Sequence, residues 1–155
     1  MPVKTRPLST DDLPQLMQWL PQEPLMQRYQ LDDAALELAL RTALPTGDIL
    51  RTADAPGAPC CALAWTQPRA GLGRGAYLRL ICVRPDRQGQ GLGQALLKAC
   101  EGASRARGQE NLMLLVSDYN ARAQSFYRRC GYVQAGVLTE YILPGVDELL
   151  FWKRL

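Results

Sequence analysis

The chain has 155 residues, of which 47% are hydrophobic and 21% charged, and its net charge is +3. A chain this long buries roughly 68–70% of its unfolded surface and fits one domain, residues 1–155. It contains no histidine, which excludes Ser-His and Cys-His nucleophilic machinery and most zinc catalytic sites. No apolar segment approaches the ~20 residues of a membrane span, and the first residues lack the basic-then-apolar order of a signal peptide. We therefore expect a cytoplasmic protein with no membrane partner.

Cysteine number and charge distribution limit the chemistry further. The cysteines are odd in number, form no C-x-x-C pair and lie mostly in apolar runs, so we expect reduced core residues: Cys60, Cys61, Cys82, Cys100 and Cys130. The net charge is +5 between Arg79 and Arg129 and −2 elsewhere. This distribution suits a polyphosphate ligand, although arginines on a solvated face would give the same count. No dense basic run with interleaved aromatics occurs, so no nucleic-acid partner is expected.

The first third of the chain predicts one strand and two helices. A strand over Val3–Leu8 precedes Ser9 or Thr10, either of which suits a helix N-cap. The first helix ends at Pro21 and carries apolar residues at i, i+3, i+4 and i+7: Leu13, Leu16, Met17 and Leu20. The second helix has an apolar face of Leu36, Ala39, Leu40, Ala43 and Leu44. The polar loop between them, Gln22–Gln30, contains residues of types that can line a substrate pocket: Met26, Arg28 and Tyr29. An ordinary exposed loop is the alternative interpretation.

Four strands are predicted in the middle of the chain. Asp48–Ala53 and Cys60–Thr66 are joined by a turn rich in Pro and Gly, and a glycine-rich hairpin tip leads to Tyr77–Val83. Further along, Leu112–Val116 is an unbroken apolar run. Such a run is typical of a central strand that is buried on both faces.

The stretch from Val83 to Leu97 passes from a strand through a glycine-rich turn into a helix. Gly89, Gly91 and Gly93 let the backbone direct several N–H groups toward one point, and the helix adds the positive end of its dipole. Gly108 is predicted to end this helix. Its predicted buried face consists of Leu92, Ala95, Leu96, Ala99 and Ala103. We therefore predict a phosphate-binding loop, with a plain turn as the alternative.

The spacing of the glycines excludes two familiar nucleotide loops. A Walker loop requires a lysine directly after its last glycine, but the nearest one, Lys98, lies two helical turns too late. A dinucleotide fold requires G-x-G-x-x-G, but the third residue after Gly91 is Gln94. Neither nucleotide hydrolysis nor dinucleotide binding is expected.

The last third of the chain predicts a helix and a hairpin. The helix runs from about Asn120 to Cys130 with Gly131 as its C-terminal cap, and the hairpin pairs Tyr132–Ile142 with Asp147–Leu155. The element order is therefore β-α-α-β-β-β-α-β-α-β-β. It indicates an α/β (mixed, α+β-like) fold with a central mixed sheet of about seven strands flanked by about four helices.

Two motifs occur on these elements. The first, V-x-P-x-x-[RQ]-G-x-G-x-G, is matched by Val83, Pro85, Gln88, Gly89, Gly91 and Gly93. The second, N-x-x-A-x-x-[FL]-Y-x-x-x-G-[FY], is matched by Asn120, Ala123, Phe126, Tyr127, Gly131 and Tyr132. With this separation and element order, nearly the whole chain resembles the GNAT superfamily of acyl-CoA-dependent N-acetyltransferases.

The resemblance implies acetyl-CoA as co-substrate and no metal. In proteins that this chain resembles, the loop amides bind the CoA pyrophosphate and the preceding strand pairs with the pantetheine. The motif Asn contacts the pantetheine, and the motif Tyr lies near the thioester sulfur. The corresponding residues are Ile81, Cys82, Val83, Gln88, Gly89, Gln90, Gly91, Leu92, Gly93, Gln94, Asn120 and Tyr127. Asn120 and Tyr127 lie two helical turns apart and so share a face. Without the motif, a buried core residue would be the simpler interpretation of Tyr127.

The implied chemistry is direct attack of an amine on the thioester. The backbone N–H of Val83 would stabilise the oxyanion, and Tyr127, the implied catalytic residue, would protonate the leaving thiolate. Many relatives place a Glu on the strand before the glycine loop, but Tyr77–Val83 contains no acid. Bacterial ribosomal-protein acetyltransferases carry a Glu five residues before the motif Asn, where this chain has Leu115. Three candidates for the base stay open: Tyr29, Asp118 and Glu140.

We therefore predict an acetyl-CoA-dependent N-acetyltransferase that acts on a primary amine of a small molecule or peptide. The alternatives are a protein N-acetyltransferase and a non-catalytic CoA-binding sensor or regulatory module. The acceptor amine and the oligomeric state, monomer or homodimer, are left open by the sequence.

Overall fold

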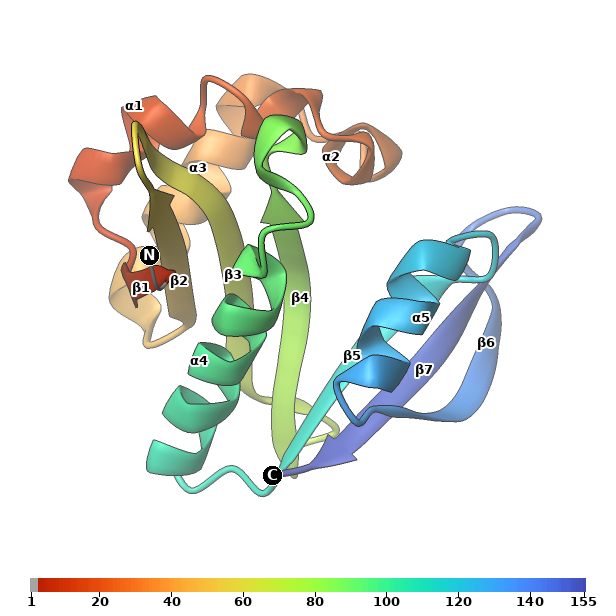
Figure 1. Cartoon of the computed structure of the whole chain (residues 1–155). Helices are drawn as coiled ribbons and strands as arrows, with labels where there is room; N and C mark the ends of the chain where they lie inside the picture. Colours follow the sequence, from red (N-terminus) through yellow and green to blue (C-terminus); the bar gives the residue numbers. More distant parts are fainter. Residues whose placement is uncertain (1–2) are drawn as a thin grey trace.

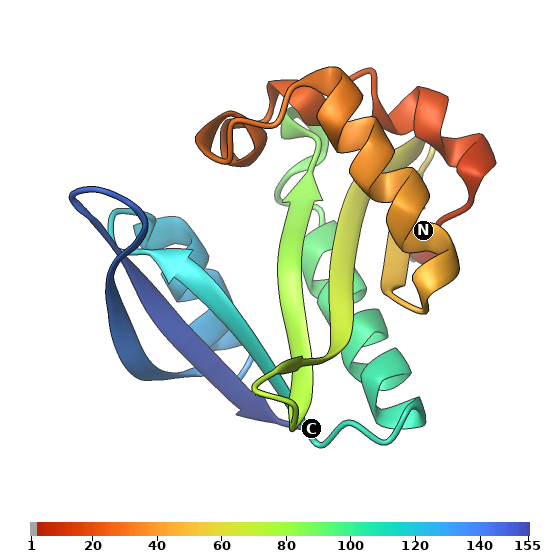
Figure 2. The ribbon, with the colours of Figure 1, turned by 180° about the vertical axis from the view of Figure 1, so that it is seen from behind.

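The computed structural model describes residues 3–155 and consists of one β-sheet with helices on both faces (Figure 1, Figure 2). Its strands are β1 (Lys4–Pro7), β2 (Ile49–Ala55), β3 (Ala58–Gly71), β4 (Gly75–Val83), β5 (Asn111–Ser117), β6 (Val133–Leu143) and β7 (Val146–Arg154). Its α-helices are α1 (Leu13–Leu16), α2 (Pro24–Arg28), α3 (Asp33–Ala43), α4 (Leu92–Ala106) and α5 (Ala121–Arg129). The sheet order is β1-β2-β3-β4-β5-β7-β6. The predicted mixed α/β fold is confirmed.

The helices cover the two faces of the sheet unequally. Helices α4 and α5 lie on one face, whereas α1 and α3 lie on the other and cover only the N-terminal half (Figure 1, Figure 2). Because side chains alternate along the strands, each face has its own apolar core. The core under α4 and α5 includes Leu78, Leu96, Leu112, Tyr132 and Phe151. The core under α1 and α3 includes Leu16, Met26, Leu40, Leu63 and Trp65.

The first predicted helix is shorter than the sequence pattern indicated. A 3-10 turn over Thr10–Asp12 leads into α1, which ends at Leu16, and a second 3-10 turn covers Leu20–Gln22. Ser9, one of the two predicted N-cap residues, is the N-cap of the first turn, and its backbone N–H donates to Asp12 Oδ2 at 2.9 Å. The predicted apolar positions Leu13, Leu16 and Leu20 are buried and Met17 packs against them. The expected continuous helix to Pro21 is wrong, because α1 ends at Leu16 and Trp19, with φ of −129° and ψ of −36°, leaves the helical conformation before the second turn.

Two further predictions are corrected. The polar loop Gln22–Gln30 contains helix α2, and its Met26 is fully buried in the core and does not line a pocket. In β5, Met113 and Leu115 are only half-buried, so the strand is not buried on both faces. The reason is that no helix covers the back of the C-terminal half of the sheet in the part that the structure describes (Figure 2).

Most of the remaining local predictions are confirmed. Helix α3 buries Leu36, Leu40 and Ala43, and Gly108 and Gly131 follow α4 and α5 with φ of 78° and 91°. On α4 the fully buried face includes Leu92, Leu96, Leu97, Cys100 and Ser104, whereas the predicted Ala95, Ala99 and Ala103 are half-buried. The five cysteines are free thiols, four of them buried and Cys130 half-buried. Across residues 3–155, no helix is long and apolar enough to cross a bilayer.

Candidate functional site

The sheet opens between β4 and β5. These parallel strands pair only at Ala76–Leu112 and Tyr77–Met113. Beyond these pairs the strands diverge toward their C-terminal ends, so the two halves of the sheet form a V (Figure 1, Figure 2). The second half of β4 therefore has a partner strand on its β3 side and none on its β5 side.

A β-bulge in β4 decides which side chains face this opening. Trp65 of β3 pairs with Leu80 and Thr66 pairs with Leu78, so Arg79 is the extra residue. Beyond the bulge, Leu80 and Cys82 are buried in the core under α1 and α3. Ile81 and Val83 consequently point to the opposite face, where they line a pocket.

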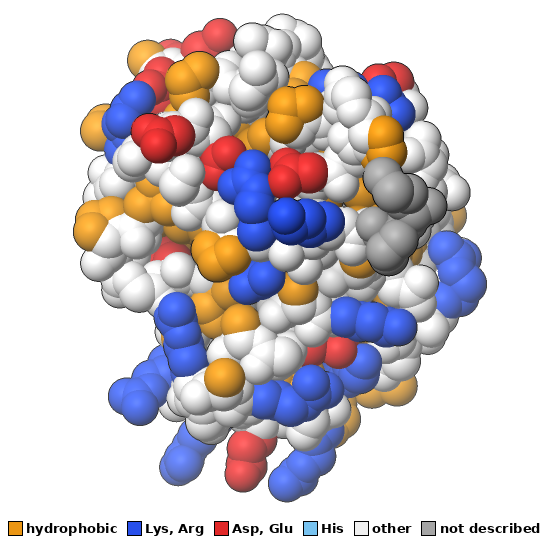
Figure 3. Space-filling model, turned by 60° about the vertical axis from the view of Figure 1, so that its left-hand side comes forward, with side chains coloured by type: hydrophobic (Ala, Val, Ile, Leu, Met, Phe, Trp, Pro, Cys, Tyr) orange, Lys and Arg blue, Asp and Glu red, His pale blue; other side chains and the backbone are white. Residues whose placement is uncertain are grey.

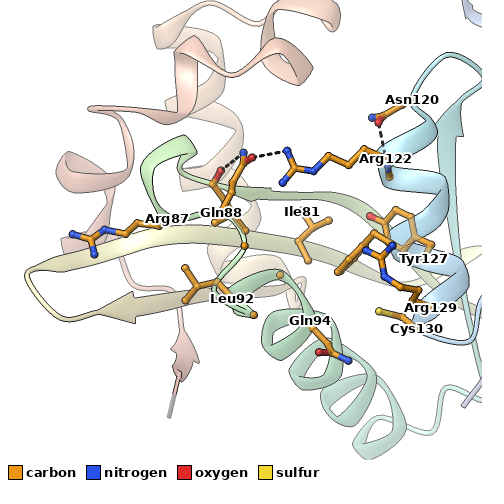
Figure 4. A pocket seen from close by; sticks show the side chains of 16 residues that line it. Ile81, Arg87, Gln88, Leu92, Gln94, Asn120, Arg122, Tyr127, Arg129 and Cys130 are labelled. Carbon is orange, nitrogen blue, oxygen red and sulfur yellow. Dashed lines mark hydrogen bonds between the residues drawn. The ribbon is translucent and has the colours of Figure 1, made fainter. Parts of the chain in front are cut away.

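The backbone of β4 also presents hydrogen-bonding groups to the opening. The N–H of Arg84 donates to the carbonyl of Cys61 at 2.9 Å, and in an antiparallel pair the bonded residues alternate. The N–H and C=O of Val83 therefore point away from β3. The Val83 carbonyl accepts a hydrogen bond from Gln88 Nε2 at 3.1 Å (Figure 4). Since β5 does not pair with this part of β4, the Val83 N–H is left as a donor at the edge of the opening.

The glycine loop forms a cradle of N–H groups at the start of α4. Gly89 and Gly91 have φ of 77° and 80°, a conformation that glycine adopts without steric cost. Gly91 is the N-cap of α4, and the N–H of Ala95 makes the first bond back to the Gly91 carbonyl at 3.0 Å. The preceding N–H groups, from Leu92 to Gln94, have no backbone partner in the described chain. Such free N–H groups at a helix N-terminus form an anion site.

A pocket of about 640 Å³ joins this loop to the opening and to α5 (Figure 4). Ten of the sequence-predicted cofactor residues line it: Ile81, Val83, Gln88, Gly89, Gly91, Leu92, Gly93, Gln94, Asn120 and Tyr127. Cys82 does not, because its side chain lies on the other face, and Gln90 is exposed on the loop. The sequence reasoning missed six residues that also line the pocket: Arg87, Arg122, Ala123, Phe126, Arg129 and Cys130.

The pocket is positively charged. Arg87, Arg122 and Arg129 line it, and no acidic side chain does. Arg122 Nη1 donates to Gln88 Oε1 at 2.9 Å, which ties α5 to the glycine loop across the pocket (Figure 4). Figure 3 shows that Lys and Arg side chains also outnumber acidic ones on the lower part of the neighbouring face. The predicted polyphosphate ligand thus finds both N–H donors and cations in one place.

The two motif residues of α5 have different surroundings. Asn120 is the N-cap, and its Oδ1 accepts the N–H of Ala123 at 3.1 Å, so its side-chain amide N–H groups stay free to donate. Tyr127 is 7% exposed, and its ring packs edge-on against Phe126 and Tyr132 with centroid distances of 5.1 Å and 5.7 Å. Burial raises the pKa of the Tyr127 hydroxyl well above its ordinary value. This phenol is therefore protonated at neutral pH.

The three candidate bases lie outside this pocket. Glu140 Oε1 accepts the N–H of Gly145 at 2.8 Å, and Asp118 Oδ2 lies 3.4 Å from the N–H of Asp147, so both carboxylates support the turn of the β6–β7 hairpin. Tyr29 follows α2, and burial raises the pKa of its hydroxyl while Arg28 counteracts this shift. A residue that sequence reasoning missed, Glu148 of β7, is fully buried near Tyr29.

The sequence of this chain is similar to those of known acetyltransferases. The family model of the acetyltransferase (GNAT) family matches residues 14–132. The chain is 34% identical to mycothiol acetyltransferase of Clavibacter michiganensis subsp. michiganensis over 78% of this chain and 37% of that protein. It is 32% identical to thialysine N-epsilon-acetyltransferase of Bos taurus over 54% of this chain and 51% of that protein. The chain thus spans less than two thirds of the length of these curated relatives.

Solved structures share the whole architecture. A GNAT family acetyltransferase from Bacillus cereus ATCC 10987 superposes with a TM-score of 0.82 at 15% identity, covering 99% of this chain and 98% of that one. The ribosomal-protein-S18-alanine N-acetyltransferase of Escherichia coli gives a TM-score of 0.76 at 24% identity, covering 99% and 94%. At these identities the likeness establishes the fold, and the sequence match establishes the family. The chain therefore belongs to the acetyltransferase (GNAT) family.

Proposed function

We propose that this chain is an acetyl-CoA-dependent N-acetyltransferase, built as a single domain over residues 1–155, that acts on a primary amine of a small molecule or peptide. The observation that carries the proposal is the convergence on one pocket of three arginines, the free N–H groups of a helix N-terminus and an unpaired strand edge. These groups fit a pyrophosphate joined to an amide-containing arm. When bound, acetyl-CoA supplies an activated acetyl thioester.

The residues that would hold the co-substrate follow from their free hydrogen-bonding groups. The loop amides from Gly89 to Gln94 bind the pyrophosphate, and Gln88 braces the end of β4 through the Val83 carbonyl. The backbone edge from Ile81 through Cys82 to Val83 pairs with the pantetheine arm as an added strand would. Asn120 donates its side-chain N–H groups to the same arm.

Two groups of this chain then promote the transfer. The free N–H of Val83 stabilises the negative charge that develops on the thioester oxygen during attack by the amine. Tyr127 donates its phenolic proton to the departing thiolate. The raised pKa of Tyr127 keeps the hydroxyl protonated at neutral pH until then. The attacking amine must be neutral, which costs about 4–5 kcal/mol at pH 7 for an ordinary alkylammonium.

Substitution of Tyr127 by Phe tests this proposal. Loss of a general acid lowers kcat by about 10²–10⁴-fold, and the affinity for acetyl-CoA, measured by calorimetry, should change little because the ring remains. Thiol release from acetyl-CoA with pooled amines, against a blank without amine, reports turnover. Tyr132→Phe is the matched control, since it removes a buried hydroxyl that donates to Glu101 at 3.0 Å outside the pocket. It should lower stability and leave kcat unchanged.

The alternatives give other outcomes. Saturable acetyl-CoA binding without thiol release in any amine pool would favour the sensor or regulatory module. Release that requires protein substrates would favour a protein N-acetyltransferase. No binding of acetyl-CoA at all would contradict the proposal.

A further inference from the structure

An ion pair connects the two halves of the sheet on the face opposite the CoA pocket. Arg28 at the end of α2 donates through Nη2 to Oε1 of Glu148 in β7, a contact between residues 120 positions apart in the chain. The Glu148 side chain is fully buried and the Arg28 side chain is 10% exposed. Neither residue lines the 640 Å³ pocket. The pair therefore belongs to a separate polar site.

The register of the strands places this site beside the opening. Glu148 pairs with Ser117 at the end of β5, and Ser117 Oγ donates to Glu148 Oε1 at 3.1 Å. Leu149 and Phe151 face the core under α5, so Glu148, on alternate positions, faces the other side. Figure 2 shows that side, where the end of α2 and the β6–β7 hairpin stand on either side of the V.

Two tyrosine side chains, Tyr29 and Tyr77, lie within electrostatic reach of the pair. Burial, with smaller contributions from Tyr29 and Glu148, raises the pKa of the Tyr77 hydroxyl to about 12. Arg28 lies 5.0 Å from the ring centroid of Tyr29, and the charge of Arg79 acts on both phenols. The site therefore combines one carboxylate, two guanidinium groups and two phenols drawn from α2, β4 and β7.

The pair is only half-satisfied. Glu148 Oε2 and Arg28 Nε are buried and have no hydrogen-bond partner among the described residues. A buried carboxylate oxygen or guanidinium N–H without a partner is costly, so such an atom normally finds one in the protein, in water or in a ligand. The unpaired acceptor and the unpaired cationic donor thus belong to the two side chains that are joined by the ion pair, and each shares a carbon with one of its bonded atoms.

We propose that Arg28 and Glu148 bind the acceptor, and that the acceptor is an α-amino acid, with its ammonium group on Glu148 Oε2 and its carboxylate on Arg28. This inference rests on the proposed function. The vacant donor and acceptor match the two charged groups that an amino acid carries on one carbon, whereas a polycation would be repelled by Arg28 and Arg79. The Arg28 guanidinium covers the carboxylate, and rotation of its long side chain admits the acceptor without movement of the α2 backbone.

The test compares free amino acids with their amides, which keep the ammonium group and lose the negative charge. For the wild type we expect kcat/KM at least tenfold higher for the preferred amino acid than for its amide. Arg28→Gln should reduce this ratio to near one with the KM for acetyl-CoA unchanged. Glu148→Gln should raise the KM for both acceptors. Arg41→Gln, which breaks the exposed ion pair with Glu37 on α3, is the matched control and should change nothing.

A second measurement, thermal stabilisation by the acceptor, needs no turnover and does not depend on the folding of a single variant. The amino acid alone should raise the Tm of the wild type and should not raise that of Arg28→Gln, and Arg28→Lys should give a smaller shift than wild type because it loses the planar fork. A wild type that prefers amides or polyamines, or an unchanged ratio in Arg28→Gln, would overturn the inference. Absence of thiol release with every amine, despite an amino-acid-induced Tm shift, would instead contradict the proposed function alone.

Discussion

Substitution of Gly91 by Ala should lower both the stability of the protein and its affinity for acetyl-CoA. Gly91 has φ of 80°, and a Cβ added there would meet no atom within 4 Å. The cost is therefore backbone strain and not a steric clash. An L-residue in this region costs about 1–2 kcal/mol, and the reduced entropy of the unfolded chain offsets about 0.4–1 kcal/mol. A net loss of about 1 kcal/mol corresponds to a fall in Tm of about 2–4 °C for a chain of this size.

The effect on binding follows from the position of Gly91 as the N-cap of α4. If the backbone relaxes from the strained conformation, the N–H groups of Leu92, Gly93 and Gln94 turn away from their common point. At about 0.3–1 kcal/mol for each N–H contact, the loss for three is about 1–3 kcal/mol, or about fivefold to 150-fold in Kd.

The matched control is Gly102→Ala. Gly102 lies on the exposed side of α4, where an added Cβ also meets no atom within 4 Å and φ is helical. Alanine stabilises a helix interior by about 0.5–1 kcal/mol over glycine, so this variant should gain Tm and keep its affinity. Thermal unfolding followed by circular dichroism and calorimetric titration with acetyl-CoA measure the two quantities. If Gly91→Ala bound acetyl-CoA as tightly as wild type, the reasoning about the N–H cradle would be refuted.

Two further predictions concern titratable groups. Hydrogen bonds from Arg6 hold the pKa of Asp12 and Asp54 below the ordinary 3.8, so their stabilisation is complete above about pH 4 and is lost as the pH falls through their folded values. Asp12→Asn should therefore flatten the decline of Tm below about pH 4, and equal slopes in the two proteins would contradict this. Burial raises the pKa of every cysteine thiol, so a disulfide reagent near neutral pH should label at most the half-buried Cys130 quickly. Rapid labelling of a second thiol in the folded protein would show that the core is open.

The sequence predicts most of the residues that line the 640 Å³ pocket because its signals are local. Positive φ at Gly89 and Gly91 and the proline before them mark the turn wherever the rest of the chain lies. The spacing of Arg122, Phe126 and Arg129 at i, i+4 and i+7 could also have indicated that α5 turns two arginines toward the same pocket.

The opposite face could not be predicted in this way. Glu148 follows Asp147 and precedes a run of four apolar residues in β7, and a charged residue at such a position is normally expected to face water. It is buried because β7 lies between β5 and β6 and because the Arg28 side chain at the end of α2 contacts it, and both arrangements depend on residues distant in sequence. Arg28 and Tyr29 were recognised as residues suited to a pocket, but the sequence gives no indication of the carboxylate that Arg28 would meet.

The divergence of β4 and β5 gives the sheet two unpaired edges in its interior, in addition to the outer edges at β1 and β6. Exposed strand edges are templates for association with other chains, and proteins usually protect them with charges, bulges or covering elements. Here the two inner edges face each other across the V, so a foreign chain must enter the opening to pair with either of them (Figure 1). An edge placed inside the sheet leaves main-chain donors free for a ligand and is harder for a foreign β-strand to reach than an outer edge.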